Sequence, residues 1–295
     1  MMGLEDLQHF YHRIGQSAVI SEGGLWLNET RLSLMTIPGV LPLRPSRMEV
    51  QRLLRQSGKM AAVFGCGFET GRVVDSFWVR DRDYGLHSLQ RQFRQQVKAA
   101  QQVCICRPVD WGEMAALALP VNRETFRRRG RGRTSMTEPD LWLKYCHAAA
   151  ALPGYEVMGC FVQGELAAYM VTWVHEGVCF GLHMFWSDAY RAAHPTHALY
   201  YETVRERMVR PGIEAMTVGR QSIPAMTSVD RFKGHAGFVR EPCRVGIVLH
   251  PAWSWLLANP LCVRGLRALR LRAEPHRPGL KNLEVFEVAS ETRLV

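Results

Sequence analysis

YEVMGCFVQGELAAYMVTWVHEGVCFGLHMFW, residues 155–186, decides the fold of this chain. Three apolar runs follow one another here, and the pairs Gly164-Glu165 and Glu176-Gly177 separate them. Apolar runs of this length, bounded by glycine-containing pairs, are typical of strands joined by tight turns. The segment therefore predicts an antiparallel meander of three strands.

The residues before the meander predict one strand and two helices. The strand covers 103–109, and the helices cover 110–119 and 138–152. Asp110 is a good N-cap for the first helix, and Pro139 suits the first turn of the second. After the meander, the pattern predicts a helix over 196–209, a strand over 213–219, a short helix over 228–238 and a strand over 243–250.

This order, from strand 103–109 to strand 243–250, predicts a mixed α/β (α+β) sheet. A doubly wound nucleotide-binding fold would alternate strands and helices regularly, which this chain does not do. Neither G-x-G-x-x-G nor G-x-x-x-x-G-K-[ST] occurs, so the phosphate-binding loops of those folds are excluded.

The pattern of the first 85 residues predicts strands and a single helix over 45–58. Another helix, which carries basic residues, is predicted over 86–102. Arg91, Arg94 and Lys98 lie on one flank of that second helix. Such a row is usually exposed to solvent, and phosphate binding is the less common alternative.

The charge balance points to an anionic partner. Lys and Arg number 37 against 27 Asp and Glu, a formal net charge of +10. A nucleic acid, a phosphorylated cofactor or an anionic membrane surface would each satisfy it. The start of the sequence lacks the apolar core of a signal peptide, and no run of 18 apolar residues occurs, so we expect a cytoplasmic chain without a transmembrane segment.

The cysteines and histidines do not predict a metal site. The eight cysteines form no C-x-x-C pair, and Cys104 and Cys106 share one face of a strand as small apolar residues do. The HPTH motif at 194–197 has no evident partner pair.

DRFKGHAGF, residues 230–238, allows two interpretations. In the first, a short helix ends at a glycine, and Phe232 and Phe238 anchor it in the core. In the second, the segment is a reactive corner of an active site. In isolation the first interpretation is favoured, and only the segment's place in the order of elements would favour the second, with Lys233 as its central residue.

The order of elements from 103 to about 250 resembles the GNAT acyltransferase fold. MTVGRQSIPAMTSVDRFKGHAGF, residues 216–238, is similar to the C-terminal signature of the FemAB-like branch of that superfamily. DYGLHSLQRQFRQQVKAA (83–100) and NRETFRRRGR (122–131) also resemble segments of FemAB-like proteins.

The resemblance implies a mostly antiparallel central sheet flanked by helices, with a reduced N-terminal GNAT-like half. The domains expected are 1–101 for that strand-rich half, 102–252 for the acyltransferase domain and 253–295 for a basic amphipathic helix and tail. The tail helix either packs on the domain or contacts RNA or an anionic membrane surface.

The activity that the resemblance implies is transfer of an acyl or aminoacyl group to an amine of a small molecule, peptide or cell-wall precursor. Lys233 would stabilise negative charge near the reacting centre, because a lysine normally remains cationic. Arg220 and Ser222, at the strand exit, would hold a phosphate or carboxylate. The other expected substrate-binding residues are Asp230, Arg191 and Tyr200.

A general base is harder to assign from the sequence. His183 alternates with Leu182 and Met184 on a strand near the expected cleft, and imidazole titrates in a useful range. A hydrogen-bonded core histidine is the alternative.

The acyl donor is either acyl-CoA or aminoacyl-tRNA, with no tightly bound cofactor. Acetyl-CoA users of this fold usually carry [Q/R]-x-x-G-x-[G/A], in which glycines let backbone N–H groups wrap the pyrophosphate. The matching stretch here is RAAHPT, 191–196, in which His194 and Thr196 replace both small residues. These side chains crowd the close approach of a pyrophosphate, whereas FemAB-like enzymes that use charged tRNA do not need this loop. The competing hypothesis is an inactive GNAT-like module that binds RNA or an anionic membrane through RRRGRGR, 127–133, and the tail.

Overall fold

The computed structural model describes residues 3–28, 32–128, 130, 134–223, 226–259, 261–262, 264–265, 268 and 284–292. The chain divides into two compact units, which are described separately. Unit 1 comprises residues 1–15, 77–219 and 231–240, and unit 2 comprises 16–76, 220–230 and 241–295. The chain passes from one unit to the other within strands β5 (Arg72–Val79) and β11 (Val239–Leu249).

Unit 1 is built on the predicted meander. Its strands follow the order β10-β9-β8-β7-β6, in which β6 to β9 pair antiparallel and β10 pairs parallel to β9. These strands are β6 (Cys104–Val109), β7 (Tyr155–Val162), β8 (Glu165–His175), β9 (Val178–Trp186) and β10 (Ala215–Arg220).

The two turns of the meander lie where glycine predicts them. Gln163 and Gly164 have φ of 52° and 87°, and Glu176 and Gly177 have φ of 48° and 75°. Two successive left-handed residues give a turn whose twist matches that of the strands on either side. The hairpins β7–β8 and β8–β9 follow directly from these turns.

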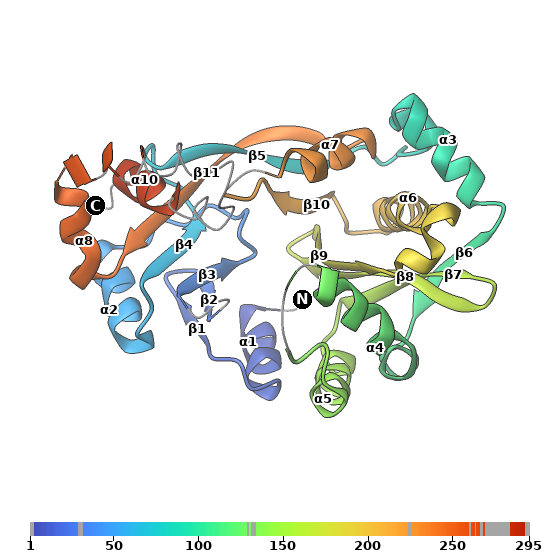
Figure 1. The fold of residues 1–295 in the computed structure, drawn as a ribbon, viewed down its shortest axis with the longest axis horizontal. Coiled ribbons are helices and arrows are strands. Elements are labelled where there is room, and N and C mark those ends of the chain that lie inside the picture. Colours follow the sequence, from blue (N-terminus) through green and yellow to red (C-terminus); the bar gives the residue numbers. More distant parts are fainter. Residues whose placement is uncertain are drawn as a thin grey trace. The chain divides into compact units, whose positions relative to one another are not determined.

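Helices cover both faces of the unit 1 sheet (Figure 1). The helices α3 and α6 pack on one face, and α4 and α5 lie on the other with α1 against α5. Their bounds are α1 (Leu4–Arg13), α3 (Arg91–Ala100), α4 (Trp111–Arg128), α5 (Pro139–Ala150), α6 (Pro195–Met208) and α7 (Thr227–His235), with short 3-10 helices at Leu86–Ser88 and Asp188–Ala193; α7 begins in unit 2 and continues into unit 1.

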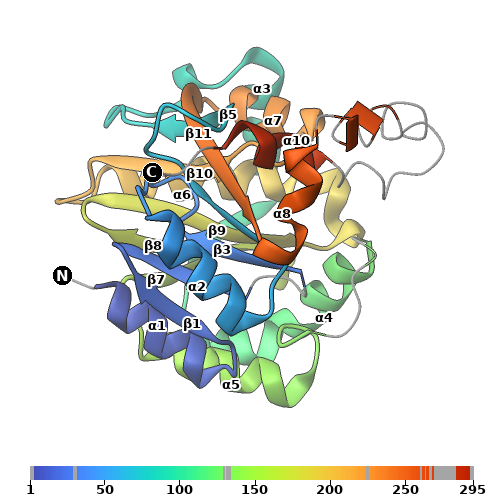
Figure 2. The same cartoon turned by 90° about the vertical axis from the view of Figure 1, so that its left-hand side faces the viewer.

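Unit 2 packs helices against a second set of strands (Figure 2). Leu53 and Leu54 of α2 pack with Phe64 on one face of β4, whereas Ala61 of β4 joins a cluster with Val288 on the other face. The alternation along β4 is that of a strand buried on both sides. The strand order here is β1-β2-β3-β4-β11. The strands are β1 (Ala18–Ser21), β2 (Gly24–Leu27), β3 (Ser33–Ile37) and β4 (Ala61–Gly65). The helices of this unit are α2 (Arg47–Ser57), α8 (Pro251–Ala258) and α10 (Glu284–Glu291).

The predicted fold class, a mixed and mostly antiparallel sheet flanked by helices, is confirmed. The start and stop of α2 are also as predicted, since Ser46 accepts from the Glu49 N–H and Gly58 closes the helix at φ 65°. Two expectations were wrong. Helix α1 was not foreseen, and the predicted helix over 110–119 continues through Pro120 to Arg128.

The domain boundaries at 101/102 and 252/253 stay a prediction. The basic segment 127–133 and the tail after 259 lie largely outside the described residues. Within the described part of the chain, no helix is both long and apolar enough to cross a bilayer.

Candidate functional site

The candidate site of unit 1 lies where β9 and β10 part. The two strands pair only over Val178–Phe180 and Ala215–Thr217, although β9 continues to Trp186 and β10 to Arg220. On its other edge β9 stays paired with β8 up to Trp186. Beyond Phe180, β9 and β10 are therefore neighbours without a shared ladder.

A β-bulge in β9 and a left-handed glycine in β10 lie where the two strands separate. The β8–β9 register shifts between Val171 and Thr172, which leaves Leu182 as the extra residue of a β-bulge. A bulge bends its strand and increases the local twist. Gly219 turns β10 at a φ of 82°, a conformation that favours glycine.

Gly181 sets the width of the gap at its closed end. A Cβ built on Gly181 would lie 3.0 Å from Cγ1 of Val218 on β10. That distance is shorter than ordinary van der Waals contact, so a larger side chain here would have to displace Val218 or fill the space between the strands.

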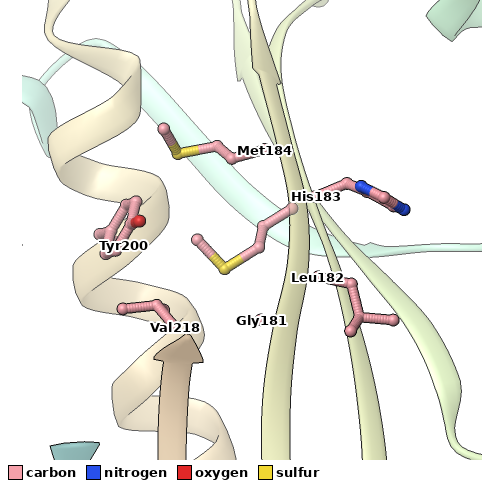
Figure 3. A pocket seen from close by; sticks show the side chains of 7 residues that line it. Gly181, Leu182, His183, Met184, Tyr200 and Val218 are labelled. Atoms are coloured by element: carbon pink, nitrogen blue, oxygen red, sulfur yellow. The ribbon is translucent and has the colours of Figure 1, made fainter. Parts of the chain in front are cut away.

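A pocket of about 110 Å³ opens between the parted strands. Figure 3 shows Met184, Tyr200 and Val218 on one side of β9 and His183 on the other. Two predicted site residues, His183 and Tyr200, therefore line one pocket from opposite faces of the sheet. The full lining comes from β8, β9, α6 and β10: Met170, Gly181, Leu182, His183, Met184, Tyr200 and Val218.

Tyr200 is the one phenol in this lining. It lies on α6 and is buried, and burial raises the pKa of its hydroxyl above the ordinary value. The hydroxyl therefore keeps its proton at neutral pH, and it can donate a hydrogen bond but not act as a base.

The first turn of α6 has little capacity to bind a diphosphate. His194, the N-cap, has a φ of 52°, and its N–H donates to the Arg191 carbonyl. Pro195 has no N–H, and the His197 N–H donates back to His194. Among the described residues of this turn, Thr196 alone has a backbone N–H that no backbone carbonyl accepts.

An aromatic cluster covers this end of α6. The His197 ring lies 4.6 Å from Phe93 of α3 and 5.2 Å from Phe232 of α7, and Phe232 lies 5.0 Å from Tyr200. Burial and the neighbouring His194 lower the pKa of His197 to about 4. His197 is thus a neutral packing residue at neutral pH, and Phe232 has the anchoring role that the sequence predicted.

Lys233 is buried, with 7% of its surface exposed, but it is not part of the pocket lining. Its Nζ lies 4.4 Å from the centre of the Phe77 ring. A buried ammonium over an aromatic face is stabilised by the ring's negative face. Strand β10 adjoins the same residue, because Thr217 Oγ1 donates to the Phe77 carbonyl at 2.9 Å. Through Phe77, the structure thus places Lys233 close to Thr217, the last β10 residue that pairs with β9.

Three predicted residues belong to unit 2. Arg220 Nε donates to the Gly39 carbonyl at 3.2 Å, and the Asp230 carboxylate accepts from Gln221 Nε2 at 3.0 Å. Ser222 is exposed, as is Arg191 of unit 1. The substrate-binding roles of these residues stay predictions.

The sequence did not single out Met170, Gly181 or Val218, although all three line the pocket. Apolar residues occur throughout these strands, so the only local signal was a glycine inside a strand. For metals, the described residues hold no group of three His, Cys, Asp or Glu side chains arranged around a common centre.

Comparisons with known proteins identify the domain and its fold. Residues 87–233 match the family model "Acetyltransferase (GNAT) domain". No curated protein matches the sequence.

Solved structures show the same fold at low identity. FemX aligns with a TM-score of 0.56 at 10% identity, covering 86% of this chain and 93% of that one. L-PGS from Bacillus licheniformis aligns with a TM-score of 0.52 at 12% identity, covering 99% and 98%. The C-terminal domain of a putative lysylphosphatidylglycerol synthetase from Agrobacterium fabrum gives 0.53 at 14% identity, covering 81% and 86%.

Residues 87–233 therefore form a GNAT domain, and the chain shares its fold with FemX and L-PGS.

Proposed function

We propose that this protein transfers an aminoacyl group from a charged tRNA to an amine acceptor, in the gap between β9 and β10. The general activity, acyl or aminoacyl transfer, is that of its family. The donor is inferred from the first turn of α6, and the name of the putative lysylphosphatidylglycerol synthetase, which includes an aminoacyl group, is compatible with it.

The first turn of α6 is the observation that carries the choice of donor. A CoA diphosphate needs several backbone N–H groups at a helix N-terminus and small residues that let it approach. Here a proline removes one N–H, internal bonds use others, and the His194 side chain occupies a glycine-like position. An aminoacyl ester carries no such diphosphate next to its reactive carbonyl, so it does not need this cradle.

The reaction that we propose is a direct displacement at the ester carbonyl. The acceptor nitrogen attacks the carbonyl carbon, and a C–N bond forms as the C–O bond to the terminal ribose breaks. The amine loses a proton and the ribose oxygen gains one, so the products are an amide and uncharged tRNA. Approximation of amine and ester in one gap supplies a large part of the acceleration.

His183 is the proposed base. It faces the side of β9 away from α6, so an acceptor that enters from that side meets the imidazole first (Figure 3). Tyr200, on the α6 side, keeps its proton and is the proposed hydrogen-bond donor to the oxygen that becomes negative. Positioned donors of this kind are typically worth about 100-fold or more in rate.

Lys233 is proposed to stabilise negative charge of the donor through its ammonium group. Because Lys233 is buried over Phe77, where the local dielectric is low, its ammonium group interacts more strongly with a negative charge than it would in water. Arg220, Ser222, Asp230 and Arg191 are proposed to bind phosphate or polar groups of the two substrates.

A thermal-shift experiment tests the donor assignment. The full chain is heated with bulk tRNA charged with the standard amino acids, with the same tRNA uncharged, or with acetyl-CoA. We expect charged tRNA at about 100 times its dissociation constant to raise Tm by about 5 °C, because a ligand of the native state stabilises it. Uncharged tRNA should give a smaller shift, and acetyl-CoA none.

Two results would overturn the assignment. A Tm shift with acetyl-CoA but not with charged tRNA would make the protein an acyl-CoA transferase. Equal shifts with charged and uncharged tRNA, lost steeply as salt rises and without release of the amino acid, would indicate an RNA-binding module without activity.

A further inference from the structure

Three cysteines gather between β6 and β7, outside the pocket and on the outer edge of the unit 1 strands. Cys104 and Cys106 belong to β6, and Cys160 belongs to β7. The Cys160 thiol interacts with those of both Cys104 and Cys106. Cys160 is buried, whereas the other two are half-buried. A buried thiol beside two half-buried ones is an arrangement that packing alone does not require.

The strand register places Cys106 directly opposite Cys160. Pro108, two residues further along β6, lies opposite Met158 and has no N–H, so that pair cannot exchange both ladder hydrogen bonds. Along an antiparallel ladder, hydrogen-bonded and non-hydrogen-bonded pairs alternate. The pair Cys106–Cys160 lies two residues from Pro108–Met158 and is therefore also a non-hydrogen-bonded pair. The Cα atoms of such pairs lie about 4.5 Å apart, within the range that a disulfide spans.

The thiols of Cys104 and Cys160 differ in acidity. The hydrogen bond from Cys160 lowers the pKa of Cys104, although burial opposes it. The hydrogen bonds with Cys104 and Cys106, together with burial, raise the pKa of Cys160. Cys104 therefore has a larger thiolate fraction than Cys160, and thiolates react with peroxides far faster than thiols.

We propose that Cys104, Cys106 and Cys160 form a hydroperoxide-reactive thiol site that closes a disulfide between β6 and β7 through Cys160. This site is independent of the proposed acyl transfer. The Cys104 thiolate attacks one peroxide oxygen, which gives a sulfenic acid and, after protonation, releases the second oxygen as water or an alcohol. The Cys160 thiol then attacks the Cys104 sulfur, and a second water leaves as the S–S bond forms.

The disulfide can move within the site without a further oxidant. Attack by the Cys106 thiol on the Cys160 sulfur releases Cys104 and produces the directly opposed Cys106–Cys160 bridge. Reduction by an external dithiol restores the three thiols. All the electrons therefore pass from two thiols to one peroxide.

Oxidation of Cys104 affects the first turn of α6, because the Cys104 thiol is hydrogen-bonded to the residue before that turn. Cys104 Sγ lies 3.3 Å from the Ala193 carbonyl, which immediately precedes the N-cap His194. A sulfur held in a disulfide has no proton to donate. While Cys104 is oxidised, this bond is lost, and the turn at 193–197 is held less firmly.

Disulfide mapping tests the proposal on the full chain. The reduced protein is treated with hydrogen peroxide, its free thiols are blocked, and linked peptides are identified by fragmentation in a mass spectrometer. We expect a link from Cys160 to Cys104 or Cys106 to dominate, and dithiothreitol to remove it. Oxidation of Cys104 to sulfinic acid without any link to Cys160 would overturn the proposal.

Matched variants separate the site from general cysteine oxidation. Cys146→Ala removes another buried thiol, whose pKa burial raises to about 12, and this variant should form the link as the wild type does. Cys160→Ala should abolish the link. Because Cys160→Ala changes a buried residue, the double variant Cys104→Ser/Cys106→Ser, at half-buried positions, provides the same test. A persistent link to Cys160 in that double variant would contradict the assignment.

Hydrogen exchange tests the connection to α6. While the Cys104–Cys160 link is present, we expect amide exchange at residues 194–198 to rise about threefold or more, with α5 unchanged. The variant Cys104→Ala should show the same rise without peroxide. Unchanged exchange in both would show that the Cys104–Ala193 hydrogen bond does not hold this turn.

Discussion

Strand β9 has two neighbours and pairs with them to different extents. It pairs with β8 along almost its whole length, from Val178 to Trp186, but with β10 only as far as Phe180. The paired edge forms the scaffold, with side chains packed on both faces. The parted edge forms the pocket. One strand thus contributes rigidity on one side and space for a substrate on the other, so a change at each edge should have a different consequence.

The largest expected effect is closure of the gap by Gly181→Val. The Cβ of the new side chain would lie only 3.0 Å from Val218 Cγ1, and its methyl groups would fill the space that the donor is proposed to occupy. We expect aminoacyl transfer to fall at least about 100-fold while Tm changes little, because reactants displaced by an ångström lose about that much. Retention of full activity in the folded variant would mean that the donor does not lie between β9 and β10.

His183→Gln tests the side of β9 from which the acceptor is proposed to enter. We expect kcat to fall about 100-fold, because general-base catalysis typically contributes that much or more. The matched control is His175→Gln on the neighbouring strand, where the imidazole stacks on Trp173 at 5.0 Å and lies outside the pocket lining. Equal losses of activity in the two variants would assign His183 a packing role.

Gly159→Ala tests the scaffold instead of the gap. A Cβ at Gly159 would lie 2.6 Å from Val109 Cγ2 and 2.9 Å from Phe161, inside the fully paired β6–β7–β8 region. We expect the free energy of unfolding to fall by about 2 kcal/mol, the usual cost of overpacking, with transfer per folded molecule unchanged. Gly234→Ala, where the new Cβ meets nothing within 4 Å, serves as the control in chemical denaturation. A stability equal to that of the wild type would contradict the tight packing.

An effect of similar size is expected from pH at the first turn of α6. The pKa of His197 is lowered to about 4 in the folded protein, so folding favours its neutral form. Its contribution to stability is therefore complete above about pH 6.5 and is lost as the pH falls towards 4, by about 2 kcal/mol after allowance for partial exposure. His197→Phe keeps the aromatic contacts, and its Tm should fall less between pH 7 and pH 4.5. Parallel pH profiles for wild type and variant would contradict this.

The meander was predictable from the sequence because its signals are local. Apolar runs fix the strands, and Gly164 and Gly177 fix the turns. Helix α1 was missed because its apolar residues span only about two turns, and the continuation of α4 was missed because Pro120 usually ends a helix.

The site was only partly predictable. His183 and Tyr200 were singled out and line the same pocket, but nothing local identifies Leu182 as a bulge or Val218 as the opposite wall. Those roles arise from pairing between strands that the sequence does not place side by side. The contact of Lys233 with Phe77 likewise joins residues on α7 and β5 that no sequence period connects.

The most direct test is a competition between donors in one reaction. Wild type and Gly181→Val are each incubated with tRNA carrying a ¹⁴C-labelled amino acid, with ³H-labelled acetyl-CoA and with a pool of amine acceptors. We expect wild type to move ¹⁴C, and not ³H, into an amide product, and Gly181→Val to move neither. Transfer of ³H in place of ¹⁴C, or ¹⁴C transfer that survives Gly181→Val, would contradict aminoacyl transfer in the gap between β9 and β10.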